Sequence, residues 1–250
     1  MPSPAEAFSI GPLVAEPVSG IAYRQRRPLR GPPAALLILL HGVGGNVQNL
    51  VALAAAAERN LHVVLPRGRL ALGTAAFAWF HVTFGADGPR IDAAEANDSR
   101  LALIRFVENL QALHGVAPRR SVIAGFSQGG ILSASVALSA PDRVAGFGLL
   151  SGRILPELEP APAPQAKLAR LRAFVGHGRA DDKLPAHSAT RSSEWLTTLG
   201  VPHTLRVYPN GHELAPAMQQ EFLQWSAAVT GCDAGAGGNA VRGSIANYLP

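Results

Sequence analysis

A serine set between glycines is the first feature of the sequence that could support catalysis. Residues 125–129 read G-F-S-Q-G, with Ser127 at the centre. A G-x-S-x-G motif is typical of a nucleophilic serine on a sharp turn between a strand and a helix. Because the chain has 26 glycines, the motif alone is weak and its context decides. Residues 122–124 predict a buried strand and residues 128–139 a helix, which favours a nucleophile over a serine that only caps the helix.

The two glycines of the motif have a geometric purpose. Gly125 and Gly129 leave space where a Cβ would collide with the neighbouring strand or helix. The turn then lifts the hydroxyl of Ser127 above the sheet. The start of the following helix adds a backbone N–H and the positive end of its dipole, which suit a developing oxyanion.

A general base for Ser127 should follow it in the sequence, because the triad residues of this fold occur in the order serine, acid, histidine. His212 meets this condition in the P-N-G-H-E segment at 209–213, a predicted turn between the last strand and the last helix. The alternative is an exposed turn histidine without a catalytic role. The other histidines are out of order or at the edges of elements: His41, His62, His81, His114, His177, His187 and His203.

Two neighbouring aspartates, Asp181 and Asp182, are the main candidates for the acid that orients the imidazole of His212. They follow a predicted strand at 171–175, and their positions in the sequence do not separate them. A solvated acidic pair without a catalytic role is the alternative. The remaining candidates lie on the preceding loop or directly beside the histidine: Glu157, Glu159 and Glu213.

A glycine-rich segment at 40–46, with the sequence L-H-G-V-G-G-N, follows a predicted strand at 35–40. It resembles the H-G loop that supplies one oxyanion-hole donor in α/β-hydrolases. The expected donors are the backbone N–H groups of Val43 and Gln128. A phosphate-binding loop is the rival interpretation, but no Lys-Ser or Lys-Thr pair follows the glycines.

Strands and helices alternate along the chain, which predicts an α/β fold with a mainly parallel, doubly wound sheet and helices on both faces. The predicted strands are continuous apolar runs, as expected for parallel strands covered on both faces. Asp92 and Glu95 predict a capping box at the start of one long helix. The predicted strands are 35–40, 61–65, 121–124, 144–150, 171–175 and 204–208. The predicted helices are 47–59, 92–115, 128–139, 187–199 and 214–229.

We expect one domain over residues 20–230, preceded by a lead-in at 1–19 and followed by a Gly-rich tail at 231–250. Two connections are longer than most loops in compact domains. The connection at 66–92 is aromatic, and Phe77, Trp79 and Phe80 are candidates for the wall of an acyl pocket, with ordinary core packing as the alternative. The connection at 152–167 has four prolines and is a candidate for a stiff rim.

The composition excludes several other classes of protein. With 48% hydrophobic and 16% charged residues the chain is globular. The formal charge of +5 is scattered, so we expect no nucleic-acid partner. A single cysteine, Cys232, excludes an intrachain disulfide. The apolar runs are too short to span a bilayer and no secretory signal is evident, so we expect a cytoplasmic monomer or homodimer without stable membrane insertion.

These motifs together resemble the phospholipase/carboxylesterase family of α/β-hydrolases, which includes bacterial carboxylesterases and acyl-protein thioesterases. The resemblance runs from about residue 20 to 229 and rests on motifs in a common order. It implies the α/β-hydrolase fold without a cap domain, and it assigns the acid to Asp181 and the base to His212. The chain departs from the family at His81, where an acidic residue is usual. The matching segments are L-H-G-V-G at 40–44, W-F at 79–80, G-F-S-Q-G-G at 125–130, L-S-G at 150–152, H-G-x-x-D at 177–181, Pro185 and G-H at 211–212.

The expected activity is the hydrolysis of small or medium acyl esters through an acyl-enzyme on Ser127, without a metal or organic cofactor. An acyl thioesterase or a lysophospholipase of the same family is an alternative. Acyl transfer to another acceptor and lactone opening are compatible with the same residues. In a different class, the chain would be a hydrolase-like binding protein without catalysis, although such a protein usually lacks a triad residue or an oxyanion glycine.

Overall fold

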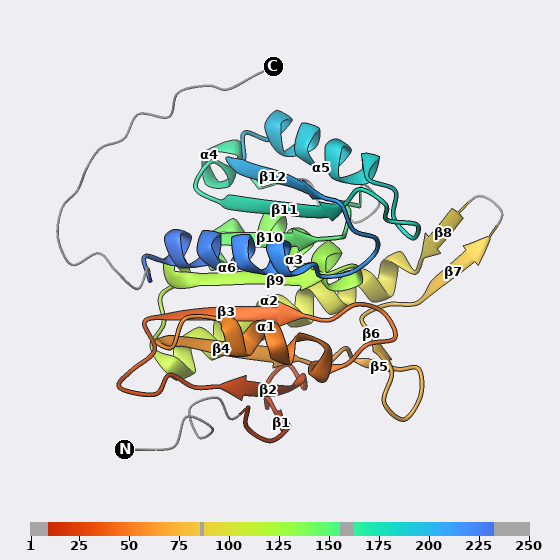
Figure 1. Ribbon diagram of the computed structural model, residues 1–250. Coiled ribbons are helices and arrows are strands. Elements are labelled where there is room, and N and C mark those ends of the chain that lie inside the picture. Colours follow the sequence, from red (N-terminus) through yellow and green to blue (C-terminus); the bar gives the residue numbers. More distant parts are fainter. Residues whose placement is uncertain (1–9, 86–87, 156–162, 233–250) are drawn as a thin grey trace.

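A central eight-stranded sheet organises the computed structural model, which describes residues 10–85, 88–155 and 163–232 (Figure 1). The strand order is β1-β2-β4-β3-β9-β10-β11-β12. In this order, the six strands β4, β3, β9, β10, β11 and β12 run parallel to one another. At the other end of the sheet, β2 pairs antiparallel with β4, and β1 pairs antiparallel with β2. The strands of this sheet are β1 (Val14–Ala15), β2 (Ala22–Arg26), β3 (Ala35–Leu40), β4 (Leu61–Pro66), β9 (Ser121–Phe126), β10 (Gly146–Leu150), β11 (Arg172–Gly178) and β12 (His203–Tyr208).

Helices cover both faces of the sheet (Figure 1). Residues of α2, α3 and α5 share one hydrophobic cluster, and residues of α1 and α6 share the other. The helices are α1 (Val51–Ala56), α2 (Ala93–His114), α3 (Gln128–Ser139), α4 (Gln165–Leu168), α5 (His187–Thr198) and α6 (Pro216–Thr230).

Strand β3 illustrates why the sheet is doubly covered. All six of its residues are buried. Leu36, Ile38 and Leu40 pack in the cluster with α2 and α3, whereas Leu37 and Leu39 pack in the cluster with α1 and α6. Each fully buried leucine contributes roughly 1.5–3 kcal/mol relative to an exposed one. The expected α/β architecture, with helices on both faces of a mainly parallel sheet, is thereby confirmed.

The carboxyl ends of the parallel strands meet at one edge of the sheet. In register, Leu40 of β3 lies beside Gly125 of β9, and Leu150 of β10 lies beside both Phe126 and Gly176. The segments that follow these strands therefore start close together. This alignment brings the glycine-rich loop, Ser127 and the loops after β11 and β12 to one site.

The amino-terminal half of the sheet differs from the sequence-based expectation. A helix over 47–59 was expected, but the chain forms a 3-10 turn at Val47–Leu50 followed by the short α1. After helix α1 the backbone turns extended at Ala57, and the guanidinium of the buried Arg26 donates hydrogen bonds to the carbonyls of Ala57 and Glu58. Arg26 belongs to β2, an antiparallel strand whose polar sequence AYRQR did not predict a strand.

Two small hairpins occupy the long connection between β4 and α2. They are β5 (Leu70–Ala71) with β6 (Phe77–Ala78), and β7 (Val82–Gly85) with β8 (Gly88–Ile91). The β7–β8 hairpin projects from the body of the molecule (Figure 1). The capping box expected at α2 is only half formed: Asp92 accepts from the Glu95 N–H, but the Glu95 carboxylate contacts His81 instead.

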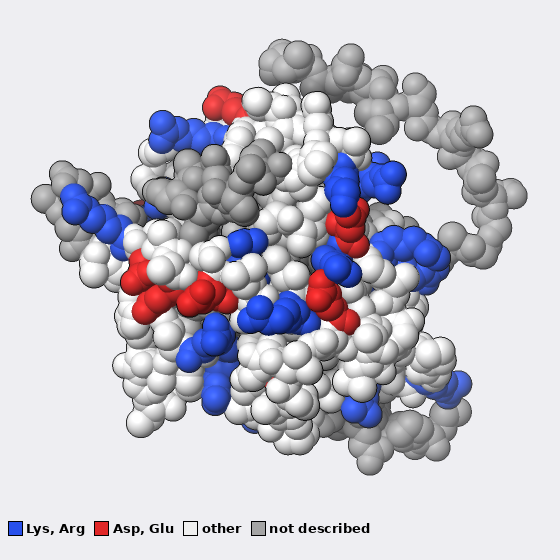
Figure 2. All heavy atoms as spheres, turned by 180° about the vertical axis from the view of Figure 1, so that it is seen from behind, with Lys and Arg blue, Asp and Glu red and all other residues white. Residues whose placement is uncertain are grey.

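Several expectations concern residues that the structure does not describe, namely 1–9 of the lead-in, 156–162 of the proline-rich connection and 233–250 of the tail. Within the described part of the lead-in, β1 pairs with β2. None of the helices in the described ranges is long and apolar enough to cross a membrane. On the face seen in Figure 2, Lys and Arg are interspersed with Asp and Glu, so the described residues form no continuous basic surface there.

A buried histidine pair predicts a pH dependence of stability. His62 of β4 is 1% exposed and its ring contacts that of His114 with 4.2 Å between centroids. Burial, together with His114 and nearby arginines, lowers the pKa of His62 to about 3. Between pH 6.5 and about 3 the unfolded chain therefore binds a proton that the folded chain does not, so the free energy of unfolding decreases as the pH is lowered through this range.

The free energy of unfolding of the wild type should decrease on going from pH 6 to pH 4. We predict that His62→Gln makes this decrease smaller by about 1.4 kcal/mol per pH unit, measured by urea unfolding. The exposed His187→Gln is the matched control and should follow the wild type. Parallel curves for the wild type and His62→Gln would contradict the prediction.

Candidate active site

Ser127 lies on a strained turn between β9 and α3. Its φ of 53° and ψ of −117° place it in a region that costs a residue other than glycine about 1–3 kcal/mol. The surrounding backbone holds the turn, because the Ser127 N–H donates to Leu150 O at 2.8 Å and its carbonyl accepts from Ile131 N–H at 3.0 Å. The serine side chain is thereby presented at the carboxyl edge of the sheet.

The glycines on either side are required by close backbone approaches. A Cβ on Gly125 would lie 2.3 Å from the carbonyl carbon of Gly129, and a Cβ on Gly129 would lie 2.2 Å from Leu40 O. Both distances are impossible for real Cβ atoms, so strand β9, helix α3 and strand β3 pack together only with glycine at these positions.

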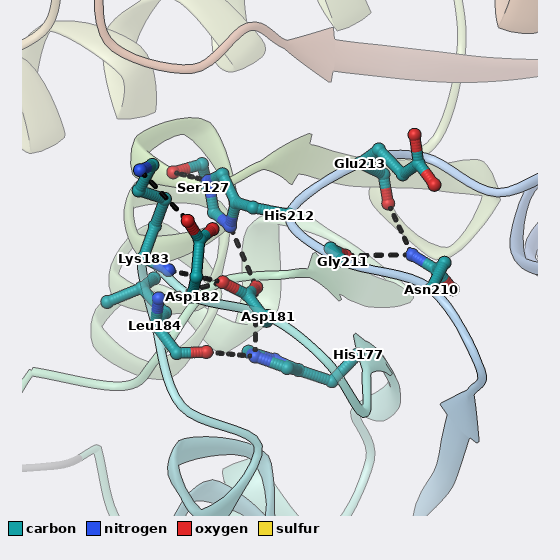
Figure 3. A network of polar contacts seen from close by, with 10 residues as sticks. All are labelled: Ser127, His177, Asp181, Asp182, Lys183, Leu184, Asn210, Gly211, His212 and Glu213. Carbon is teal, nitrogen blue, oxygen red and sulfur yellow. Dashed lines mark hydrogen bonds and ion pairs between the residues drawn. The ribbon is translucent and has the colours of Figure 1, made fainter.

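His212 links Ser127 to Asp181 (Figure 3). Its Nε2 lies 3.0 Å from Ser127 Oγ, and its Nδ1 lies 2.8 Å from Asp181 Oδ2. The histidine belongs to the loop between β12 and α6. The side-chain amide of Asn210 shapes this loop by donating to the carbonyls of Gly211 and Glu213.

Asp181 is 7% exposed, on the loop after β11. Its Oδ1 accepts hydrogen bonds from the backbone N–H groups of Lys183 and Leu184 at 2.9 and 2.8 Å. Burial by itself would raise the pKa of this carboxyl, but the hydrogen bonds from Leu184, His212 and Lys183 together hold the pKa below its usual value. Asp181 is therefore ionised at neutral pH and accepts hydrogen bonds through both oxygens.

The structure brings Asp181, and not its neighbour, to the histidine. The carboxylate of Asp182 is exposed and contacts Lys183 Nζ at 3.1 Å. Of the other acids considered, Glu157 and Glu159 lie outside the described residues. Glu213 follows His212 and accepts the Asn210 amide through its backbone carbonyl.

A second histidine, His177, touches the same carboxylate. It is fully buried, and its Nε2 lies 2.8 Å from Leu184 O and 3.2 Å from Asp181 Oδ2. Because a carbonyl oxygen only accepts, Nε2 carries the hydrogen and the ring donates toward both oxygens. His177 precedes the candidate acids in the sequence, so its position argues against a role as the general base. The H-G-x-x-D motif at 177–181 was the sequence signal that links His177 to Asp181.

The expected oxyanion donors lie on two segments that meet beside Ser127. A Cβ on Gly42 would be 3.3 Å from Ser127 Cβ, so the glycine-rich loop is in van der Waals contact with the serine. Gln128 is the first residue of α3, and its N–H is among those without an acceptor inside the helix. Val43 and Gln128 both line the cavity at Ser127.

The aromatic residues considered for the acyl-pocket wall are not among the described residues that line the cavity at Ser127. Trp79 and Phe80 are fully buried in the core, and neither they nor Phe77 line the cavity at Ser127. The indole N–H of Trp79 donates to His41 O. The backbone of Phe77 pairs with Gly44 and with Gly45.

These contacts brace the oxyanion segments from behind. The Gln128 side chain accepts from Trp79 N–H at 2.8 Å and donates to Phe80 O at 2.7 Å. His41 Nε2 accepts from Gly68 N–H, so its Nδ1 carries a hydrogen and donates to Gly42 O at 2.7 Å. Burial lowers the pKa of His41, which keeps the ring neutral in this bridging position.

A cavity of about 310 Å³ opens beside Ser127. Its walls are mainly apolar, and two cationic side chains, Arg153 and Lys183, also line it. Within the described residues, no group of three His, Cys, Asp or Glu side chains is arranged to hold a metal ion. The apolar side chains of the wall are Val43, Val82, Ile91, Phe126, Ile131 and Leu184.

The sheet is mainly parallel, and a strained serine turn follows β9. An acid follows β11 and a histidine follows β12, so the fold and the site are those of an α/β-hydrolase. More narrowly, the chain belongs to the phospholipase/carboxylesterase family, whose model matches residues 28–227. It is therefore a serine hydrolase of the carboxylesterase and thioesterase type.

Individual relatives agree with this assignment. The chain is 27% identical over 205 residues to acyl-protein thioesterase 1 of Eremothecium gossypii, covering 77% of this chain and 86% of the relative. A solved carboxylesterase from Mesorhizobium loti superposes with a TM-score of 0.74 at 24% identity, covering 86% of this chain and 98% of that one. The solved Bacillus cereus carboxylesterase superposes with a TM-score of 0.71 at 17% identity, covering 84% of this chain and 94% of that one. Because both solved structures are less than 25% identical to this chain, their similarity concerns the fold.

We predict that Gly125→Ala destabilises the protein by about 3 kcal/mol, because the new Cβ would overlap the backbone of Gly129. The matched control is Gly73→Ala, since a Cβ at Gly73 would meet nothing within 4 Å. The control should change stability by less than about 0.5 kcal/mol. Chemical denaturation measures both, and equal effects of the two substitutions would refute the packing argument.

Proposed function

We propose that the protein is a carboxylesterase that hydrolyses small or medium acyl esters through an acyl-enzyme, with Ser127, His212 and Asp181 as its catalytic triad. The observation that carries this proposal is the continuous line of contacts from Ser127 Oγ to His212 Nε2 at 3.0 Å and from His212 Nδ1 to Asp181 Oδ2 at 2.8 Å. These contacts open onto a cavity able to hold the substrate.

The protonation states follow from the hydrogen bonds. The ionised carboxylate of Asp181 accepts only, so Nδ1 of His212 carries the hydrogen and Nε2 is free to accept the proton of the Ser127 hydroxyl. The serine oxygen then attacks the ester carbonyl carbon, and a tetrahedral oxyanion forms. The imidazolium is stabilised by Asp181 and gives its proton to the leaving oxygen as the carbon–oxygen bond breaks. Water repeats the sequence and releases the acid.

The oxyanion is held by the backbone N–H groups of Val43 and Gln128 in this proposal. Loss of one such donor lowers turnover by about 10²–10³-fold in other serine hydrolases. Their positions depend on the contacts from His41, Trp79 and the Gln128 side chain. These residues are positioning residues, because they act through the backbone of the oxyanion segments.

The size of the cavity supports a small or medium acyl group. Its volume of about 310 Å³ is at the lower end of the roughly 300–1,000 Å³ usual for small-molecule pockets. A thioesterase activity is the second candidate, because a relative is named acyl-protein thioesterase 1 and the same oxyanion chemistry serves thioesters. A binding protein without catalysis is disfavoured, since serine, histidine, acid and oxyanion segments are all in place.

The cellular setting is part of the proposal. The single cysteine, Cys232, is buried and unpaired, which suits the reducing cytoplasm where we expect the enzyme to work. We expect a monomer or a homodimer and a small-molecule ester as its partner.

We predict that 4-nitrophenyl esters from acetate to palmitate are hydrolysed with a maximum at short or medium chain length, because the cavity is small. Ser127→Ala and His212→Gln should lower kcat by about 10⁴-fold or more. Asp181→Asn should lower it by about 10⁴-fold, because the amide favours the wrong histidine tautomer. Steady-state kinetics measures each variant.

The neighbouring Asp182→Asn is the matched control and should retain the wild-type rate, since the carboxylate of Asp182 is exposed and pairs with Lys183 rather than with His212. Equal losses for the two aspartate variants would overturn the assignment of the acid. Unchanged turnover in Ser127→Ala would overturn the proposed function as a whole.

A further inference from the structure

Two cationic side chains line the otherwise apolar cavity at Ser127. Arg153 and Lys183 both contribute to its wall, and no carboxylate does so among the described residues. Asp181 is buried behind His212, and its carboxylate already accepts hydrogen bonds from this histidine and from two backbone N–H groups. Within the described part of the chain, the cavity therefore combines an apolar wall with two cationic side chains.

Arg153 is held close to the nucleophile by the backbone. It follows Gly152, whose Cβ position would lie only 3.0 Å from Ser127 O, so the chain after β10 passes directly beside the serine. The Arg153 side chain is half-buried and lines the cavity. A guanidinium keeps its charge at every physiological pH, and it binds carboxylates and phosphates through paired hydrogen bonds.

Lys183 adds a second, weaker positive charge. Its backbone N–H holds Asp181, and its side chain runs toward the end of the site where the Ser127 hydroxyl lies (Figure 3). The ammonium is 3.1 Å from Asp182, but both side chains are more than 60% exposed. Exposed pairs of this kind are worth about 0–1 kcal/mol, so Lys183 can exchange this partner for an anion in the cavity.

We propose that the enzyme prefers esters that carry an anionic group, a carboxylate or a phosphate, a few bonds from the reacting carbonyl, and that Arg153 is the residue that binds this group. This inference rests on the proposed function and names its substrate class. The apolar wall contacts the hydrocarbon between the ester and the anion. Lys183 strengthens the attraction at the mouth of the cavity.

Matched substrates separate this preference from simple hydrophobicity. On the acyl side, 4-nitrophenyl hydrogen adipate is compared with 4-nitrophenyl hexanoate, in which a methyl group replaces the carboxylate. On the leaving-group side, the butyrate esters of 4-hydroxybenzoate and of 4-hydroxybenzamide are compared, and a butyrate ester of 4-hydroxyphenyl phosphate tests phosphate at the same place. Ser127→Ala serves as the background for spontaneous hydrolysis.

In the wild type we expect kcat/KM to be about tenfold or more higher for the anionic member of one of these pairs, as one charge-assisted hydrogen bond provides. Arg153→Gln should remove this preference, and Lys183→Gln should reduce it about two- to fivefold. The ratio of anionic to neutral substrate is the readout, so intrinsic differences between leaving groups cancel when variants are compared. About 1 M salt should weaken the preference by screening.

The control variant is Arg119→Gln, which makes the same change of charge before the start of β9, at the opposite edge of the sheet. It should keep the wild-type ratio. The inference would be overturned if neutral esters were hydrolysed as fast as anionic ones. It would also be overturned if the ratio of kcat/KM for anionic and neutral substrates were unchanged in Arg153→Gln. Neither result would contradict the esterase activity itself. Failure of every ester to react would overturn the proposed function instead.

Discussion

The architecture of this site depends on one constraint, the contact between backbones where β9 turns into α3. Gly125, Gly129 and the end of β3 approach so closely that no Cβ fits between them. That contact keeps Ser127 at a positive φ, at a cost of about 1–3 kcal/mol. The same packing brings the glycine-rich loop against the serine and leaves the first N–H of α3 without a helical acceptor. The proposed nucleophile and the proposed oxyanion donors are thus positioned by one feature of the fold.

The acid and the base are coupled to this turn through the parallel sheet. Strands β9, β10, β11 and β12 end at the same edge, so loops distant in sequence meet above it (Figure 1). Asp181 is held by two backbone N–H groups and by His177, and it in turn orients His212. A rigid carboxylate behind a histidine is what general-base catalysis at a serine requires. Arg153 and Lys183 line the same cavity and are the basis of the proposed preference for anionic esters.

The sequence predicted those parts of the site that are local or ordered along the chain. Ser127 is preceded by a buried strand and followed by a helix, and His212 comes after the acids, so both patterns are visible without coordinates. Position along the chain does not separate Asp181 from Asp182, and only the family resemblance favours Asp181. In the structure Asp181 contacts His212 and accepts the N–H groups of Lys183 and Leu184, whereas Asp182 is exposed. The roles of Trp79 and Phe80 depend on which way each side chain points, and aromatic composition alone does not determine this. Strand β2 was not predicted because its sequence, AYRQR, is polar.

The central claim is that the fold, and not the motif, makes Ser127 nucleophilic. Its most direct test is labelling with a fluorophosphonate, read by intact mass and by peptide mapping. The account predicts one adduct per chain, on Ser127, formed by the folded protein and lost after unfolding in urea. An adduct on another residue, equal labelling of the unfolded chain, or labelling that survives Ser127→Ala would contradict it.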